Sequence, residues 1–304
     1  MRAVPFLEKD VNFLNRWEQY MEQFPKVDTW FVIYDTSWTD NRKINKVVTF
    51  SLCPATLDLE KLKHFLEENL VTDIKSCSHV PSKTIQFLKN DPQFFSISFV
   101  VKNMEESIPL SGIQDLLHKM EMRVHNVSSE PEKRRLRKLK DLNVYVNRKK
   151  CDIVLLNKLF LISYLLSFIL EFLTLFQNAK RAYWFPDRET EVFYKDKVLL
   201  DLVYLVYCDM MEKHHVYPLV LRGCIADTNE KKYPHDALIR YPDYIAGVLA
   251  SVDLETGQGG EEKHQLLWQH AICNNPRMVV FKIDAGSLSN TPLTLPCVLD
   301  KRKI

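Results

Sequence analysis

The chain has 304 residues, of which 46% are hydrophobic and 26% are charged, a composition typical of a globular protein with a large core. Its formal net charge of +2 excludes a strong global positive field, so any affinity for nucleic acid must come from local basic clusters. Seven scattered cysteines without a Cys-x-x-Cys pair argue against a disulfide framework or a zinc knuckle, and favour a cytoplasmic protein with reduced thiols.

The N-terminal part predicts a helix followed by a hairpin. Residues 10–24 carry apolar side chains at helical spacing, with Asp10 as the N-cap, so residues 1–28 are expected to form an appended helical extension to a domain at 29–304. Residues 1–30 lack the basic lead, apolar core and cleavage site of a secretory signal, so we expect none. Runs rich in β-branched and aromatic residues predict strands at 30–35, 46–53 and 93–102. Helices are predicted at 57–70 and 108–122.

A long apolar segment at residues 153–176 follows Arg148 and its neighbouring lysines, as a membrane span can. At about 100° per residue, however, its polar side chains fall on one narrow stripe, which predicts a soluble helix with this stripe facing water. The stripe consists of Ser163, Ser167, Glu171, Thr174 and Asn178. We therefore expect a buried or half-buried helix packed on a sheet and no association with a membrane.

Strands and helices alternate in the C-terminal half. Strands are predicted at 181–185, 217–226 and 277–283, and Pro186 is expected to end the first of them because proline offers no ladder donor. Helices are predicted at 191–213 and 236–252, the second mostly after Pro242. The complete pattern predicts an α/β fold, with a mixed sheet flanked by helices.

Three aspartates stand where an apolar run meets a change of chain direction. Asp35 follows the apolar run 31–34, Asp187 follows 183–186, and Asp243 precedes 244–250. This placement is expected to gather three carboxylates at one edge of the sheet, where oxygen ligands suit a divalent metal ion. Taken singly, an aspartate after a strand is also a common turn former, and one at a helix start is a common cap.

The order of the motifs around these acids resembles a known family. The motifs are Tyr34-Asp35-Thr36-Ser37 at a strand end, Asp73-Ile74-Lys75-Ser76 after a helix, Asp187-Arg188 at a second strand end, and Asp243 opening an Ile-Ala-Gly helix at Gly247. From about residue 30 to 252, this succession is similar to the bacterial and phage family catalogued as domain of unknown function 3800, which resembles the ribonuclease H fold. Three positions depart from the family pattern: Thr36 and Asp73 stand where it has glutamate, and Arg240-Tyr241-Pro242-Asp243 replaces Gln-x-Ala-Asp.

The resemblance implies a ribonuclease H-like, metal-dependent nuclease of a bacterial defence system or mobile element, which acts on RNA or DNA and can have a protein partner in a multi-component system. Such a site is expected to use two Mg²⁺ or Mn²⁺ ions roughly 4 Å apart to hydrolyse a phosphodiester bond. Asp35 would bridge the ions, Asp187 and Asp243 would complete their ligands, and Asp73 would be a fourth acid. Lys75 would neutralise the scissile phosphate or orient water. Because Thr36 replaces an acid, the alternative is an inactive module that binds nucleic acid or protein.

A basic stretch at residues 133–150 contains a single acid, Asp141. It could follow a nucleic-acid backbone or be a solvated helix and turn. The candidate contacts to nucleic acid are Arg134, Arg135, Arg137 and Lys138 of this stretch, together with Arg188.

Overall fold

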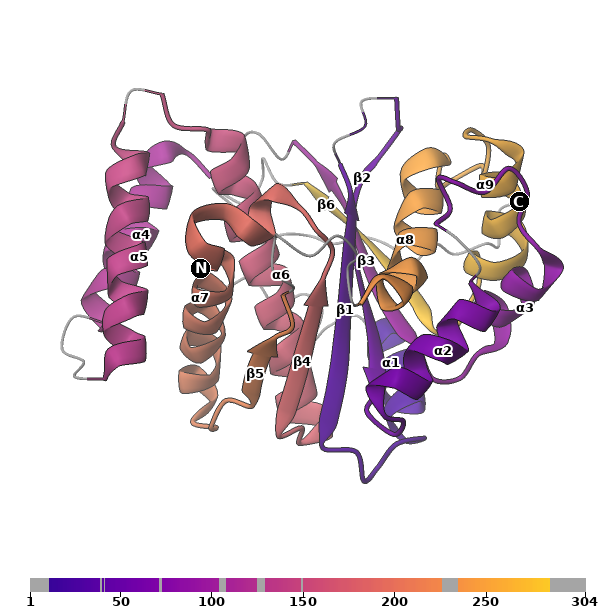
Figure 1. Ribbon diagram of the computed structural model, residues 1–304, viewed down its shortest axis with the longest axis horizontal. Helices are drawn as coiled ribbons and strands as arrows, with labels where there is room; N and C mark the ends of the chain where they lie inside the picture. The colour runs from indigo at the N-terminus through magenta and orange to yellow at the C-terminus, as the bar shows by residue number, and fades with distance from the viewer. Residues whose placement is uncertain are drawn as a thin grey trace.

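A six-stranded mixed sheet forms the centre of the protein in the computed structural model, with helices on both faces (Figure 1). The structure describes residues 11–38, 40, 42–70, 73–103, 108–124, 129–148, 150–225 and 235–284. The strands are β1 (Thr29–Ser37), β2 (Lys46–Pro54), β3 (Phe95–Lys102), β4 (Arg181–Pro186), β5 (Val220–Gly223) and β6 (Met278–Asp284).

The strand order across the sheet is β5-β4-β1-β2-β3-β6. Strands β1, β2 and β3 form an antiparallel meander, whereas β4 is parallel to β1, β5 is parallel to β4, and β6 is parallel to β3. This arrangement confirms the predicted fold class, because it is an α/β sheet flanked by helices that is consistent with a ribonuclease H-like fold.

The two faces of the sheet bury separate hydrophobic cores, as the alternation of side chains along β1 shows. Trp30, Val32 and Tyr34 point into one core, and Phe31 and Ile33 point into the other. The first core is covered by α1 (Val11–Met21), α4 (Leu110–Val124), α5 (Glu130–Val146), α6 (Ile153–Gln177) and α7 (Thr190–His214). The second is covered by α2 (Leu59–Asn69), α3 (Ser82–Asn90), α8 (Asp236–Ser251), α9 (Glu262–Leu267) and a π-helical turn at Trp268–Ile272.

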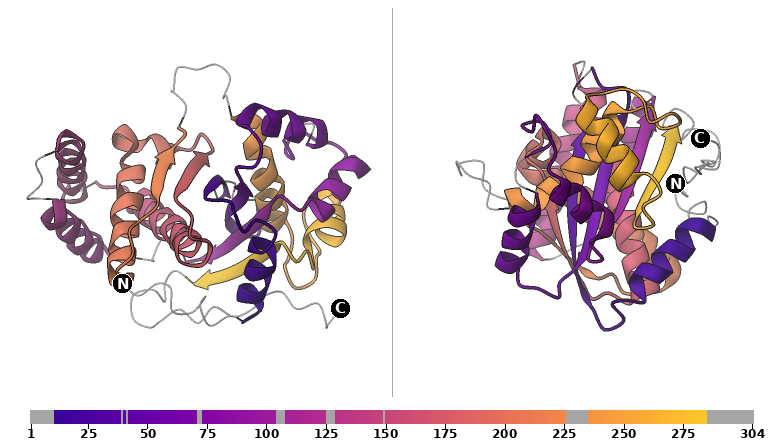
Figure 2. Two further views of the ribbon diagram at one scale, coloured as in Figure 1. Left: turned by 90° about the horizontal axis from the view of Figure 1, so that it is seen from below. Right: turned by 90° about the vertical axis from the view of Figure 1, so that its right-hand side faces the viewer.

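Helix α1 packs against α6 and the sheet through aromatic side chains. Its Phe13 ring lies 5.3 Å from that of Phe172 on α6 and 5.4 Å from that of Phe281 on β6, measured between ring centroids. Tyr20 donates a hydrogen bond to the carbonyl of Gln93 at 2.7 Å. Figure 2 shows α1 beside the edge of the sheet that carries β6. The N-terminal helix therefore contributes to the first core.

The long apolar helix α6 is buried, but its polar stripe does not face water as predicted. It is long and apolar enough to cross a membrane, yet 83% of its most apolar window lies inside the protein. Ser163, Ser167, Glu171 and Thr174 are buried. The Ser167 hydroxyl donates to the carbonyl of Val203 on α7 at 3.0 Å. The prediction failed because polar groups on a helix can face a neighbouring helix whose carbonyls and side chains satisfy them.

Other elements differ from the predictions in extent. Helix α3 and the helical segment from α9 to Ile272 were not predicted, and the strand predicted at 217–226 is limited to Val220–Gly223. The basic stretch forms most of α5. Asp10 and Ala226 lie outside the described residues.

Candidate metal site at the sheet edge

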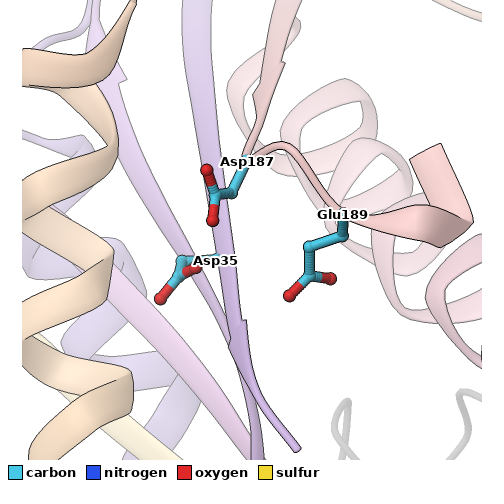
Figure 3. A group of neighbouring side chains, drawn as sticks. All are labelled: Asp35, Asp187 and Glu189. Carbon is cyan, nitrogen blue, oxygen red and sulfur yellow. The ribbon is translucent and has the colours of Figure 1, made fainter. Parts of the chain in front are cut away.

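Three carboxylates meet where β1 and β4 end. Asp35 lies on β1, and Asp187 directly follows Pro186, which pairs with Tyr34 in the parallel register. Glu189 comes two residues later, at the start of α7. One carboxylate oxygen from each residue lies within 4.8 Å of the other two, and Figure 3 shows the three side chains beside one another. These three residues are called the carboxylate cluster below.

Asp35 is the most enclosed member of the carboxylate cluster. Its side chain faces the second core, and only 3% of the residue is exposed. Its Oδ2 is buried and has no hydrogen-bond partner among the described residues. Burial raises the pKa of Asp35 well above its ordinary value, and the negative charges of Asp243, Asp187 and Glu189 raise it further.

Glu189 is the member that sequence reasoning missed. Its carboxylate accepts hydrogen bonds from the hydroxyls of Thr36 and Tyr34, the latter at 3.3 Å. Burial raises the pKa of Glu189 to about 7, against the lowering effect of the Thr36 hydrogen bond. Thr36, the residue found where the family has an acid, thus binds a carboxylate from another element. The sequence feature that could have identified Glu189 is its position two residues after Asp187, just beyond a predicted strand.

Asp243 lies beside the carboxylate cluster, inside α8 rather than at the start of a helix as predicted. Helix α8 begins at Asp236, and both Pro242 and Asp243 lie inside it. Asp243 Oδ2 accepts a hydrogen bond from the backbone N–H of Ile74 at 3.2 Å. Gly247, one turn further along α8, allows this approach, because a Cβ there would lie 2.9 Å from the side chain of Ile74.

The electrostatic surroundings of Asp243 connect it to the same region. Burial raises its pKa to about 6, although Lys75 and the Ile74 hydrogen bond act in the opposite direction. Asp243 is also the acid whose charge raises the pKa of Asp35 the most. The negative charges of Asp187, Glu189 and Asp243 therefore all raise the pKa of Asp35.

Asp73 and Lys75 flank this group on the exposed segment after α2. Burial lowers the pKa of Lys75, but the acids Asp243, Asp35, Asp187 and Asp73 outweigh this effect and raise it. Burial raises the pKa of Asp73, and the negative charge of Asp236 raises it further, whereas the positive charge of Arg240 lowers it. Among the described residues, the ligand atoms of Asp35 and Asp187 meet at the carboxylate cluster, whereas Asp243, Lys75 and Asp73 are connected to these acids by the effects of their charges.

The predicted nucleic-acid contacts fall into two places. Arg188 is exposed beside Asp187, whereas Arg134, Arg135, Arg137 and Lys138 lie on α5, at the opposite side of α7 from β1 (Figure 1). Arg134 pairs with Asp196 at 2.7 Å, and Lys138 pairs with Asp201 at 2.8 Å. A groove of about 670 Å³ lies between α5 and the N-terminal part of α7. We call this the basic groove, and its lining consists of Glu130, Pro131, Arg134, Arg135, Arg137, Lys138, Asp196, Lys197, Leu200 and Asp201.

The carboxylate cluster could bind a metal ion. Its ligand atoms are all carboxylate oxygens, which hard divalent cations prefer over nitrogen or sulfur. The unpartnered Oδ2 of Asp35 independently points to a missing positive partner, because a buried carboxylate oxygen without a hydrogen bond is costly. Both observations fit a cation held by Asp35, Asp187 and Glu189.

No family model, curated protein or solved structure matches the chain in the three comparisons. The functional assignment therefore depends on the geometry and electrostatics of this site.

Proposed function

We propose that this protein is a divalent-metal-dependent nuclease that hydrolyses phosphodiester bonds. The observation that carries the proposal is the carboxylate cluster, where Asp187 and Glu189 lie close to a buried Asp35 whose Oδ2 has no hydrogen-bond partner among the described residues. Such crowding of like charges is unfavourable in a folded protein unless the acids take up protons or a cation compensates them. The arrangement is typical of a metal site rather than of a solubilising surface.

Each acid has a specific part in this proposal. Asp35, Asp187 and Glu189 would hold Mg²⁺ or Mn²⁺, and Asp243, whose charge also acts on Asp35, would help to hold a second ion. When bound, the metal activates water and stabilises the leaving oxygen. The Thr36 hydroxyl orients Glu189, and Lys75 neutralises charge on the substrate.

The substrate in this proposal is RNA or DNA in the cytoplasm. Arg188 beside the carboxylate cluster and the basic groove would contact the phosphate backbone, and the resemblance to the family of unknown function 3800 adds bacterial defence or a mobile element as the context. In the basic groove, Asp196 and Asp201 already neutralise part of the positive charge. We therefore expect the groove to give weak, salt-dependent binding that supports the site.

A cleavage assay with Mg²⁺ or Mn²⁺ tests the proposal on RNA, single-stranded DNA, duplex DNA and RNA/DNA hybrid. We expect at least one substrate to be cut, and Asp35→Asn and Asp187→Asn to abolish cutting. Undiminished cleavage in both variants would contradict the proposal.

The alternative is a module that binds nucleic acid or a protein partner without catalysis, and Thr36 in place of an acid is the observation that favours it. This alternative predicts no binding of Mn²⁺ at the carboxylate cluster. A Mn²⁺ titration followed by electron paramagnetic resonance separates the two, because loss of the bound signal in Asp35→Asn would argue against the inactive module.

A further inference from the structure

A lysine that the sequence did not single out reaches the same edge of the sheet. Lys43 lies in the turn between β1 and β2, and its Nζ donates a hydrogen bond to the Ser37 hydroxyl at 2.5 Å. Ser37 is two residues beyond Asp35 on β1, so the two side chains leave the same face of the strand. The ammonium group of Lys43 is therefore held on the face of β1 that carries Asp35.

The turn that carries Lys43 is anchored to α8. The side-chain amide of Asn45 donates hydrogen bonds to the carbonyls of Leu249 at 2.8 Å and Val252 at 2.9 Å. The backbone N–H of Asn45 donates to the carbonyl of Ala250 at 3.0 Å. These bonds satisfy carbonyls at the C-terminal end of α8, the helix that also carries Asp243. Lys43 thus differs from an ordinary surface lysine, because the chain two residues further on is bonded to α8 and the Lys43 side chain is half-buried.

Lys43 and Lys75 are electrostatic neighbours although they come from different loops. Burial lowers the pKa of Lys43, and the positive charge of Lys75 lowers it further, whereas Asp243 and Asp35 act in the opposite direction. Lys75 responds to Asp243 and Asp35 as well. Lys43 binds Ser37, two residues beyond Asp35, and Lys75 directly follows Ile74, whose backbone N–H binds Asp243, so the two ammonium groups approach the same acids from different loops.

We propose that Lys43 and Lys75 together form a phosphate-binding site beside the carboxylate cluster. Lysine binds phosphate as a compact point charge with three donors, and here two lysines would offset the repulsion between the acids and an incoming phosphate group. The Ser37 hydroxyl that accepts the hydrogen bond from Lys43 is neutral, so it does not neutralise the positive charge of the lysine. The inference rests on the proposed function for its substrate, a nucleic-acid phosphate, but phosphate binding can be measured without cleavage.

The probe is thymidine 5′-monophosphate in the presence of Mg²⁺, with thymidine as the control that lacks the phosphate. Isothermal titration calorimetry is expected to show that the wild-type protein binds the nucleotide and that Lys43→Gln weakens binding about tenfold or more, because charge-assisted hydrogen bonds to phosphate are strong. Lys43→Arg should retain most of the affinity. Arg42→Gln is the matched control, because Arg42 lies in the same turn, is 90% exposed and pairs with Asp40.

Two further measurements separate a phosphate-binding role from a structural one. Lys43→Gln should keep the Mn²⁺ affinity of the wild type, and in a cleavage assay it should raise KM more than it lowers kcat. If Lys43→Gln does not fold, Lys75→Gln on the exposed segment carries the same test and should weaken nucleotide binding.

The outcomes distinguish this inference from the proposed nuclease activity. Nucleotide binding that depends on Lys43, without cleavage of any nucleic acid, would support the phosphate site and count against the nuclease. Cleavage with unchanged KM and unchanged nucleotide affinity in Lys43→Gln would overturn the phosphate site and leave the nuclease intact. Failure of the wild-type protein to bind the nucleotide better than thymidine would also overturn it.

Discussion

The carboxylates at the sheet edge and those of α7 that face α5 have opposite surroundings. Asp201 on α7 lies 2.8 Å from Lys138 and 3.2 Å from Arg135, and a hydrogen bond from Arg134 lowers the pKa of Asp196. At the sheet edge, burial and neighbouring acids raise the pKa of Asp35 instead. Acids paired with cations stabilise a structure, whereas buried acids crowded together indicate a site that requires a cation.

Glu189 and Glu191 lie on one short segment but differ in their partners. Glu191 pairs with Lys158 at 2.9 Å, whereas Glu189 belongs to the carboxylate cluster. We expect Glu189→Gln to lower Mn²⁺ affinity and cleavage by about 100-fold or more, because even groups that only support metal ligands are worth 10- to 100-fold. Glu191→Gln is the matched control. It should destabilise the protein but keep Mn²⁺ affinity, and equal losses of affinity in both variants would contradict the assignment of Glu189.

The stability of the metal-free protein should fall as the pH rises. The folded-state pKa of Glu189, about 7, lies above its ordinary value of 4.5, so the folded protein binds this proton more tightly than the unfolded chain does. This stabilisation is complete below about pH 4.5 and is lost as the pH rises through 7. Asp243 has a folded-state pKa of about 6, also above its ordinary value, so its contribution to stability likewise falls as the pH rises. From Glu189 alone we expect the free energy of unfolding to decrease by roughly 3 kcal/mol, since one pKa unit is worth about 1.4 kcal/mol, and Asp243 adds to this decrease.

Urea denaturation in a metal chelator, repeated with Mn²⁺, measures this effect. Mn²⁺ should restore stability most strongly at high pH, because the ligands must lose their protons before they bind metal. A metal-free protein that is equally stable from pH 4.5 to 8 would argue against crowding of these acids.

Asp35→Asn should stabilise the metal-free protein while it removes the metal site. The amide carries no charge, so the cost of burying an unpartnered carboxylate disappears, by about 1 to 3 kcal/mol. Thermal unfolding at pH 8 in a chelator, compared with the wild type, measures the gain. A destabilised variant would mean that the Asp35 carboxylate supports the fold directly.

Asp201→Asn tests the other side of the comparison and should have the smallest effect. It leaves Arg135 and Lys138 without a partly buried counter-charge, so we expect a loss of about 1 kcal/mol of stability with unchanged Mn²⁺ affinity. Asp209→Asn is the control, because Asp209 forms more exposed pairs with Arg123 and Lys213 and should lose less. A large drop in Mn²⁺ affinity for Asp201→Asn would link the basic groove to the metal site.

Much of the fold and part of the candidate site followed from local patterns in the sequence. Asp35 and Asp187 were predictable because each directly follows an apolar run that forms a strand, and the parallel pairing of β1 with β4 then places them side by side. Glu189 was not predictable in the same way, because its role depends on Thr36 and Tyr34, more than 150 residues earlier in the chain. Lys43 was overlooked for a similar reason, since a lysine in a hairpin turn has no signal of its own.

Local patterns predicted most of the strands and helices, because the spacing of apolar residues and the effect of Pro186 act over short stretches of chain. What the polar groups face depends on contacts between distant segments. The stripe on α6 faces α7 instead of water, Asp243 meets the backbone of Ile74, and the basic residues of α5 meet the acids of α7. The physical reason is that the cost of burying a charge or a hydrogen-bonding group is set by its partners, which come from distant parts of the chain.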